Sequence, residues 1–330
     1  MKKNDIYNIN CNKKMINYII LVHENPLQLI RLINKLSDNQ VNFYIHIDKL
    51  VDSSPFLEAT KTIKNIHFIS DDKREEGIWC GIGLIKATIN TLNQIVKEGR
   101  RGYCILLSGQ DYPVKNNNYI KTYLSENYGK NFIETFNIPT DNWSHNGMDR
   151  INNYKFNLSN KRGHFVIVPS IFQLEFYSLK TLKSVLKLIL NNKFLLIYKL
   201  FIKRKHTNNI SPKGGSAFWG LPIETVKNVI LFLEKNPEFL SYHKFTFIPD
   251  ELFFQTIVSH LNKKTPELMS SPLTFVDWEQ EDSIGAPNLS IEHYNKIINQ
   301  PDTILFARKF KFDYDSKILA KLDVYLEKPY

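Results

Sequence analysis

The chain has 330 residues, of which 43% are hydrophobic and 13% aromatic, with 13 glycines and 14 prolines. This composition supports a large hydrophobic core and excludes a disordered or fibrous chain. The formal net charge of +10 favours an anionic partner, such as a nucleotide, a nucleic acid or an acidic membrane surface. Because no recognised nucleic-acid-binding motif accompanies this charge, nucleic acid is not expected as a partner.

The cysteine content indicates the cellular compartment. The three cysteines, Cys11, Cys80 and Cys104, match no zinc-site spacing and are expected to be reduced thiols. No stretch is long enough to span a bilayer, and the apolar run over residues 16–22 is too short and too late for a signal peptide. We therefore expect a cytoplasmic protein.

The first part of the chain alternates between short apolar runs and amphipathic segments. The runs predict strands and the 3.6-residue spacing predicts helices, with strands at 18–22, 43–47, 66–69 and 104–107 and helices at 27–36 and 84–96. This alternation is typical of an α/β fold of the Rossmann type, with a mostly parallel central sheet flanked by helices. No G-x-G-x-x-G pattern follows the first strand, which argues against a nicotinamide cofactor.

The second part of the chain is more varied. Residues 130–165 are polar and irregular and are expected to be loops that line a site. Residues 171–204 are densely apolar, and almost all of their polar residues are lysines. Such a basic amphipathic segment predicts either surface helices packed on the core or an element that rests on anionic lipid. After it we expect a strand at 216–221 and helices at 224–234 and 252–261.

These patterns predict the domain organisation. We expect residues 1–14 to be an N-terminal tail and residues 15–313 to be a single domain. Residues 171–206 are expected to be a basic amphipathic helical insertion in this domain, and residues 314–330 to be a C-terminal helix or tail.

A carboxylate follows the buried strand at Cys104–Leu107. The sequence breaks there into Ser108-Gly109-Gln110-Asp111, and Pro113 cannot continue a central strand. In open α/β sheets, ligands bind at this carboxyl edge. Asp111 is therefore either a ligand-binding residue or an ordinary cap of the turn.

Three other motifs could carry chemistry. In Pro249-Asp250-Glu251, an acid at the start of a helix is either a simple cap or a general base that the helix dipole keeps ionised. The adjacent cations Arg308 and Lys309 form either a solvated turn or a diphosphate site. Trp79, which has glycines on both sides, is either a core residue or a stacking surface for a sugar or a base.

The sequence gives little support for a metal site. The D-x-D motif at residues 313–315 follows no clear buried strand, and the nine histidines show no ligand spacing. The acidic residues at 71–72 and 279–282 are expected to lie in solvated loops. We therefore expect no metal and no other cofactor.

In chain order, these motifs resemble the core-2/I-branching β-1,6-N-acetylglucosaminyltransferases and, more closely, the peptide O-xylosyltransferases. Residues 18–23 and 43–49 are similar to the family's first two strands, and Ile78-Trp79 with Gly81 and Ala87 resembles its W-G-G-x-S-x-x-x-A segment. The other matches are residues 107–114 with L-S-G-x-D-Y-P-I, 215–219 with G-S-x-W-W, 249–256 with the helix that carries the catalytic base, and 306–310 with the diphosphate clamp.

The resemblance implies a GT-A-like nucleotide-sugar fold. It also implies an inverting, metal-independent transferase that moves xylose or N-acetylglucosamine from a UDP-sugar to a hydroxyl of a glycan, free or lipid-linked, and forms a β-glycosidic bond. Glu251 would be the catalytic base, and Glu134, Arg150 and Trp219 would bind the acceptor. The UDP-sugar would be bound by Val22, His23, Asp48, Trp79, Ser108, Asp111, Arg308 and Lys309.

The chain also departs from the family. Ala217 replaces an acidic residue of the xylosyltransferases, which leaves the acceptor open, and an Arg of the branching enzymes is missing near Thr274. The disulfide-forming cysteines and the membrane anchor of the animal enzymes are not expected here. The alternative is a non-catalytic basic protein that binds a membrane surface or an anionic glycan on a decayed transferase fold. If residues 171–206 rest on anionic lipid rather than pack on the core, they would give peripheral contact with the inner membrane face.

Overall fold

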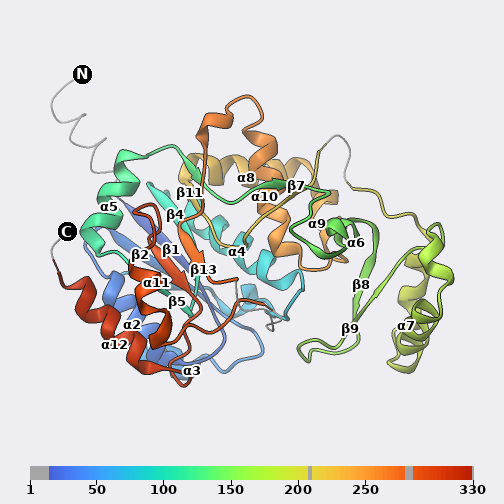
Figure 1. Cartoon of the computed structure of the whole chain (residues 1–330), viewed down its shortest axis with the longest axis horizontal. Coiled ribbons are helices and arrows are strands. Elements are labelled where there is room, and N and C mark those ends of the chain that lie inside the picture. The colour runs from blue at the N-terminus through green and yellow to red at the C-terminus, as the bar shows by residue number, and fades with distance from the viewer. Residues whose placement is uncertain (1–14, 207–209, 279–284, 329–330) are drawn as a thin grey trace.

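The computed structural model describes residues 15–206, 210–278 and 285–328, so the predicted tail at 1–14 lies outside the described residues. A seven-stranded sheet with the order β12-β6-β11-β4-β1-β2-β3 forms the centre of the molecule (Figure 1). The strands are β1 Ile16–Val22, β2 Val41–Ile47, β3 Ile66–Phe68, β4 Tyr103–Ser108, β6 Asn131–Phe132, β11 Gly220–Pro222 and β12 Met269–Ser270. The neighbours β4, β1, β2 and β3 are parallel, and β11 runs antiparallel to β4 and β6. The predicted α/β fold with a mostly parallel sheet is confirmed.

The sheet separates two hydrophobic cores because its central strands are buried on both faces. Along β1, Tyr18 and Ile20 face one core, whereas Ile19 faces the other. Helices α2 (Pro26–Leu36) and α12 (Ser316–Leu326) pack on the first face, and α4 (Gly83–Lys97), α8 (Ile223–Lys235) and α10 (Phe253–Leu261) pack on the second. This two-sided burial explains why the strands are continuous apolar runs rather than alternating ones.

A second, three-stranded sheet brings the C-terminal part of the chain to the edge of the first. It consists of β13 (Thr274–Val276), β14 (Phe306–Arg308) and β5 (Asp111–Pro113), in that order. Strand β14 is antiparallel to β5, and Arg308 is paired in register with Asp111. Since β5 follows directly after β4, this pairing places the predicted cations at the carboxyl edge of the central sheet.

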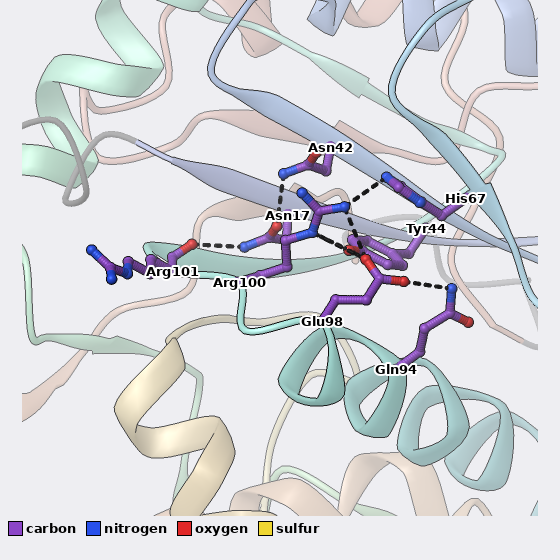
Figure 2. A network of polar contacts seen from close by, with 8 residues as sticks. All are labelled: Asn17, Asn42, Tyr44, His67, Gln94, Glu98, Arg100 and Arg101. Carbon is purple, nitrogen blue, oxygen red and sulfur yellow. Dashed lines mark hydrogen bonds and ion pairs between the residues drawn. The ribbon is translucent and has the colours of Figure 1, made fainter.

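A polar network fixes the opposite, amino-terminal edge (Figure 2). The buried Tyr44 donates to Glu98 Oε2 at 2.6 Å, and Arg100 donates to the same oxygen at 2.9 Å and contacts the ring of His67 at 3.1 Å. Asn42 donates to Asn17 Oδ1 at 3.1 Å. These bonds tie the end of α4 to β1, β2 and β3 far from the predicted ligand edge.

The remaining elements are short and connect these layers. The other helices are α3 Ser54–Thr60, α5 Asn117–Glu126, α6 Met148–Asn152, α7 Leu179–Leu190, α9 Pro237–His243 and α11 Tyr294–Ile298. The 3₁₀ helices are η1 Asp71–Lys73, η2 Ser144–Gly147, η3 Leu174–Tyr177, η4 Phe194–Phe201, η5 Pro249–Glu251, η6 Pro266–Leu268 and η7 Ile291–His293. The other strands form two antiparallel pairs, β7 Phe136–Asn137 with β10 Lys213–Gly214, and the hairpin of β8 Tyr154–Asn157 with β9 Phe165–Val168.

Residues 171–206 form an arm that carries α7 and η4. Together with β8 and β9, the arm has a small hydrophobic cluster of its own, which includes Phe156, Val168, Leu188 and Leu200. Figure 1 shows α7 at one end of the molecule, opposite to α5 and α12. None of the helices in the described part of the chain combines the length and the apolar character that a bilayer crossing requires.

Two predicted elements differ from the observed ones. The strand expected at 216–221 begins only at Gly220, because the backbone N–H of Ser216 donates to the Glu134 carboxylate at 2.8 Å rather than to a neighbouring strand. The region 130–165, expected to be loops, contains β6, β7, α6 and β8, and β9 begins at its last residue. Alternating residues of β8 and β9 cover the core of the arm. The predicted C-terminal helix is α12, and its Ile318, Leu319 and Leu322 lie fully buried in the main core.

We expect Asp323→Ala to lower the free energy of unfolding by about 1–3 kcal/mol. Asp323 on α12 accepts two hydrogen bonds from Arg31 on α2, at 2.9 and 2.7 Å, and one from Tyr112 on β5 at 2.5 Å. Its removal leaves a buried tyrosine hydroxyl and a guanidinium without this carboxylate. Urea unfolding measures the change. As a control, Glu58→Ala removes an exposed ion pair with Lys61 and is expected to change stability by less than about 1 kcal/mol; equal effects of the two variants would contradict the prediction.

Candidate functional site

The centre of the candidate site is a buried contact between Asp111 and Arg308. Asp111 is fully buried, and its Oδ2 accepts hydrogen bonds from the Ser108 backbone N–H at 2.6 Å and the Ser108 hydroxyl at 2.5 Å. Its Oδ1 lies 3.5 Å from Arg308 Nε. Burial raises the pKa of Asp111, and the Arg308 charge opposes this shift. One carboxylate oxygen therefore caps the turn, as one alternative predicted, while the other faces the guanidinium.

Arg308 is enclosed rather than solvated. Its guanidinium carbon lies 3.7 Å from the centre of the Phe218 ring, and 17% of its side chain is exposed. Burial lowers the pKa of Arg308, whereas the charges of Asp111, Asp250 and Glu251 raise it. The predicted diphosphate cation and the predicted catalytic base thus lie close enough to interact electrostatically.

Three further cations gather around this point. Burial lowers the pKa of Lys309, and the neighbouring charges of Arg162, Arg308 and Lys311 lower it further. Arg162 comes from the β8–β9 hairpin, far from β14 in the sequence. Such a concentration of like charge is unfavourable without a counter-ion, so the cluster of Arg162, Arg308, Lys309 and Lys311 is suited to an anion. Glu24 moderates the charge at Lys309 and forms an ion pair with Lys311 at 3.5 Å, and Asp111 lies 3.5 Å from Arg308.

Trp79 lies beside this cluster. Its ring faces the Arg162 guanidinium, with 5.2 Å between the guanidinium carbon and the ring centre, and it contacts the ring of Phe165 at 6.2 Å. The indole is half-buried rather than part of the core. This position leaves both a structural contact and a stacking surface available to the same ring.

Three of the predicted UDP-sugar-binding residues, Val22, His23 and Asp48, follow or end β1 and β2. The Asp48 carboxylate accepts from the backbone N–H groups of Leu50 at 2.8 Å and Gly77 at 2.9 Å, and the Asp48 N–H donates to the Val22 carbonyl at 2.8 Å. A side chain at position 77 would begin 2.6 Å from Asp48 Oδ2, so glycine permits this approach. The parallel register aligns Val22 with residue 47 and residue 21 with Ser108, which brings Val22, His23, Asp48 and Ser108 to one edge.

Glu251 is held by an arginine. Arg150 Nη1 donates to Glu251 Oε2 at 2.6 Å, and its guanidinium carbon lies 3.5 Å from the centre of the Trp143 ring. Within the described residues, Oε1 of Glu251 accepts no hydrogen bond. Arg150, which was predicted to bind an acceptor, therefore orients the predicted base.

Asp250, next to Glu251, is a buried carboxyl that the sequence analysis did not assign. Burial and the adjacent Glu251 charge raise the pKa of Asp250 to about 7, and its Oδ1 has no hydrogen-bond partner among the described residues. The negative charge of Asp250 raises the pKa of Cys80 and of Lys155. For Lys155, burial has the larger and opposite effect and lowers the pKa to about 8. Asp250 could have been identified as a site residue from its place in the helix-start motif, whereas no motif in the sequence contains Lys155.

The two other predicted acceptor residues have different positions. Glu134 is exposed, and its carboxylate accepts a hydrogen bond from the backbone N–H of Ser216. The preceding residue, Gly215, donates its backbone N–H to the Glu251 carbonyl at 3.0 Å. Glu134 therefore lies near Glu251. Trp219 is 1% exposed and packs against Phe254 in the core, with 5.2 Å between the ring centres. The structure therefore corrects the assignment of Trp219, because a residue buried in this way offers no surface to an acceptor. The neighbouring Phe218, which faces Arg308, was not predicted as a site residue.

The acidic residues do not form a metal centre in the part of the chain that the structure describes. No group of three or more His, Cys, Asp or Glu side chains there has the arrangement of a metal site. Asp315 of the D-x-D motif accepts from the backbone N–H groups of Lys317 at 2.9 Å and Ile291 at 2.8 Å, so it caps α12. Residues 279–282 of the predicted acidic loops lie outside the described residues.

The fold and the gathered charges are consistent with the GT-A-like class of glycosyltransferase fold. Residues 16–298 match the Core-2/I-Branching enzyme family, and the chain belongs to this family, as the resemblance predicted. Xylosyltransferase 2 of Homo sapiens is 28% identical over 142 residues, which cover 41% of this chain and 16% of that protein. Xylosyltransferase 2 of Bos taurus is 20% identical over 337 residues, which cover 94% of this chain and 33% of that protein.

Another group of relatives consists of proteins named N-acetylglucosaminyltransferases. The Mus musculus protein named beta-1,3-galactosyl-O-glycosyl-glycoprotein beta-1,6-N-acetylglucosaminyltransferase 4 is 34% identical over 131 residues, which cover 38% of this chain and 28% of that protein. The chain thus spans no more than 33% of the length of each of these three relatives.

We expect Asp250→Asn to stabilise the protein, and to do so more at higher pH. Because the pKa of Asp250 is raised from 3.8 to about 7, the folded state holds a proton that the unfolded state has already lost. The resulting loss of stability grows as the pH rises from about 4 to about 7 and is complete above that. The gain from Asn should therefore be about 1–3 kcal/mol larger near pH 8 than near pH 5. Thermal unfolding across this range measures it.

The control for this experiment is Asp141→Asn, which changes an exposed carboxylate in the same way. Its effect on stability should be small at every pH. A pH-independent effect of Asp250→Asn would show that the carboxyl of Asp250 ionises normally in the folded protein.

Proposed function

We propose that the chain is an inverting glycosyltransferase that moves xylose or N-acetylglucosamine from a UDP-sugar to a hydroxyl of a glycan, without a metal ion. The observation that carries this proposal is the convergence of Arg162, Arg308, Lys309 and Lys311 beside Glu251 at the carboxyl edge of the sheet. Both xylosyltransferase and N-acetylglucosaminyltransferase relatives support the choice of sugars.

The cations would serve the leaving group. When the bond between the anomeric carbon and the UDP oxygen breaks, its electron pair stays on the diphosphate, and the four cations would stabilise that charge as it develops. Arg308 supplies a planar fork, and Lys309 supplies a compact point charge. A bound divalent ion does this work in many nucleotide-sugar enzymes, and the excess of positive charge here supports a metal-independent reaction.

Glu251 would serve the acceptor. The acceptor hydroxyl oxygen forms the new bond to the anomeric carbon on the face opposite to UDP, and its proton passes to Glu251. Arg150 holds Oε2, so Oε1 is the oxygen that would take the proton. A single displacement of this kind turns an α-linked donor into a β-glycoside.

The other residues would position the two substrates. We assign Val22, His23 and Asp48 to the uridine end, because they share the edge formed by β1 and β2. Trp79, Ser108 and Asp111 would lie along the sugar and diphosphate, next to the cation cluster. Glu134 and Arg150 flank Glu251 and would meet the acceptor glycan.

We expect Lys309→Met to weaken UDP binding by about 10- to 100-fold, because it removes one charge-assisted contact with the diphosphate. Uridine, which has no diphosphate, should bind equally to both proteins. Isothermal titration with UDP and uridine separates the two effects, and chelation of metals with EDTA should leave UDP-sugar hydrolysis unchanged.

Lys227→Met, on the exposed surface of α8, is the matched control and should not change UDP binding. A requirement for Mn²⁺, or equal losses of UDP and uridine affinity, would argue against the role of the cation cluster.

We expect Glu251→Gln to reduce turnover of the UDP-sugar by about 100-fold or more, because Gln keeps the shape but accepts no proton. UDP affinity should stay the same, since Glu251 would act on the acceptor. Initial rates and UDP titration of both proteins measure the two quantities. The exposed Glu267→Gln, on η6, provides the matched control.

Normal turnover in Glu251→Gln would exclude Glu251 as the base. UDP binding without turnover in the unchanged protein would instead favour the alternative, a non-catalytic binding protein on a decayed transferase fold.

A further inference from the structure

The arm at residues 171–206 exposes an unusual amount of apolar surface. Among the described residues, thirteen of the twenty-one exposed large hydrophobic side chains lie on it. They are Phe172, Leu174, Tyr177, Leu179, Leu182, Leu186, Ile189, Leu190, Phe194, Leu195, Tyr198, Phe201 and Ile202, and their exposed fractions run from 46% to 89%. Apolar patches of this density on a folded surface mark an interaction site.

Helix α7 shows how the apolar and charged residues are divided. Leu179, Leu182, Leu186, Ile189 and Leu190 are exposed and recur at helical spacing, so they form one stripe. The buried Thr181 and Leu188 form a different face that packs on the arm's own cluster. The helix therefore has two apolar sides, of which one is buried in the arm and the other is exposed.

The charge of the arm is almost entirely positive. Lysines on α7 lie next to the exposed stripe, at positions 180, 183 and 187, and others follow at 193, 199, 203 and 205. Glu175 is the arm's single acidic residue in the sequence. None of these lysines forms an ion pair with another described residue. A second copy of the chain is a poor occupant, because a symmetric contact would place these lysines against each other.

The base of the arm is joined to the candidate site by hydrogen bonds. Arg204 is 7% exposed and donates to the backbone carbonyls of Arg150, Asn153 and Tyr242. Arg150 is the residue that holds Glu251. An object bound to the arm would thus lie at a fixed position relative to the predicted base.

We propose that residues 171–206 rest on an anionic lipid bilayer. The exposed stripe of α7 and the apolar residues of η3 and η4 would enter the boundary between headgroups and acyl chains, and the lysines would contact the anionic headgroups. Because the cytoplasmic leaflet carries the anionic lipids, the protein would act at the inner face of the membrane. If the proposed function holds, on which this last step rests, the acceptor is a glycan carried on a lipid.

The test is flotation of the full chain with vesicles of equal parts phosphatidylcholine and phosphatidylglycerol, or of phosphatidylcholine alone. We expect binding to the anionic vesicles and much weaker binding to the neutral ones, with a decrease at high salt. Lys180→Gln, Lys183→Gln and Lys187→Gln together should lower the affinity roughly a hundredfold, since each lysine at such a surface contributes about fivefold. Leu186→Ser with Leu190→Ser should also abolish flotation. These side chains are exposed, so folding is not at risk.

The matched control combines Lys227→Gln and Leu231→Ser, which change exposed residues of α8 and should leave flotation unchanged. Absence of binding to anionic vesicles, or equal binding by the triple lysine variant, would overturn the proposal. So would dimerisation in analytical ultracentrifugation that Leu186→Ser with Leu190→Ser removes, because the occupant would then be a second copy. Hydrolysis of UDP-sugar in solution tests the proposed function separately, and its failure would leave flotation unaffected.

Discussion

The pairing of β14 with β5 is the constraint on which the candidate site depends. It places Arg308 opposite Asp111 and encloses the guanidinium between a buried carboxylate and the ring of Phe218. Removing a charged group from water costs free energy unless its partners compensate. Asp111 compensates only in part, because its Oδ1 lies at the long distance of 3.5 Å. The geometry therefore leaves Arg308 with binding capacity for a further anion.

The residues of the site come from several segments, and each segment is held in place by a different kind of contact. The ends of β1, β2 and β4 meet because parallel strands share one carboxyl edge. Glu251 is placed by the η5 turn and by Arg150, and Arg162 is placed by a hairpin outside the central sheet. Positive charge is concentrated around Arg308 and Lys309, and the carboxylates Asp250 and Glu251 lie beside Arg308. This separation of charge is what transfer of a sugar from a nucleoside diphosphate requires.

The arm adds a second, independent surface to the same molecule. Its buried face supports β8 and β9, which carry Arg162 and Lys155 toward the site. Its exposed face carries thirteen large hydrophobic side chains. Through Arg204 and Arg150, a continuous line of hydrogen bonds joins the arm to Glu251. The surface of the arm and the candidate site at Glu251 are thus connected by contacts within one chain.

The sequence by itself determined the elements and the family. Apolar runs and their periodicity predicted the parallel strands, because these signals depend only on neighbouring residues. Local motifs marked Asp111, Glu251, Arg308 and Lys309 but left their roles open, and the resemblance to the family assigned them to one site. The tertiary structure alone decided which side chains share a space. Trp219 turned into the core while Phe218 faced Arg308, and Arg162 joined the site from a hairpin with no motif of its own. Asp250 belongs to the helix-start motif and Arg150 was predicted to bind an acceptor, but the burial of Asp250 and the bond from Arg150 to Glu251 were not predicted. Burial, long-range pairing and charge–charge distance arise only when distant segments pack, and no local pattern records them.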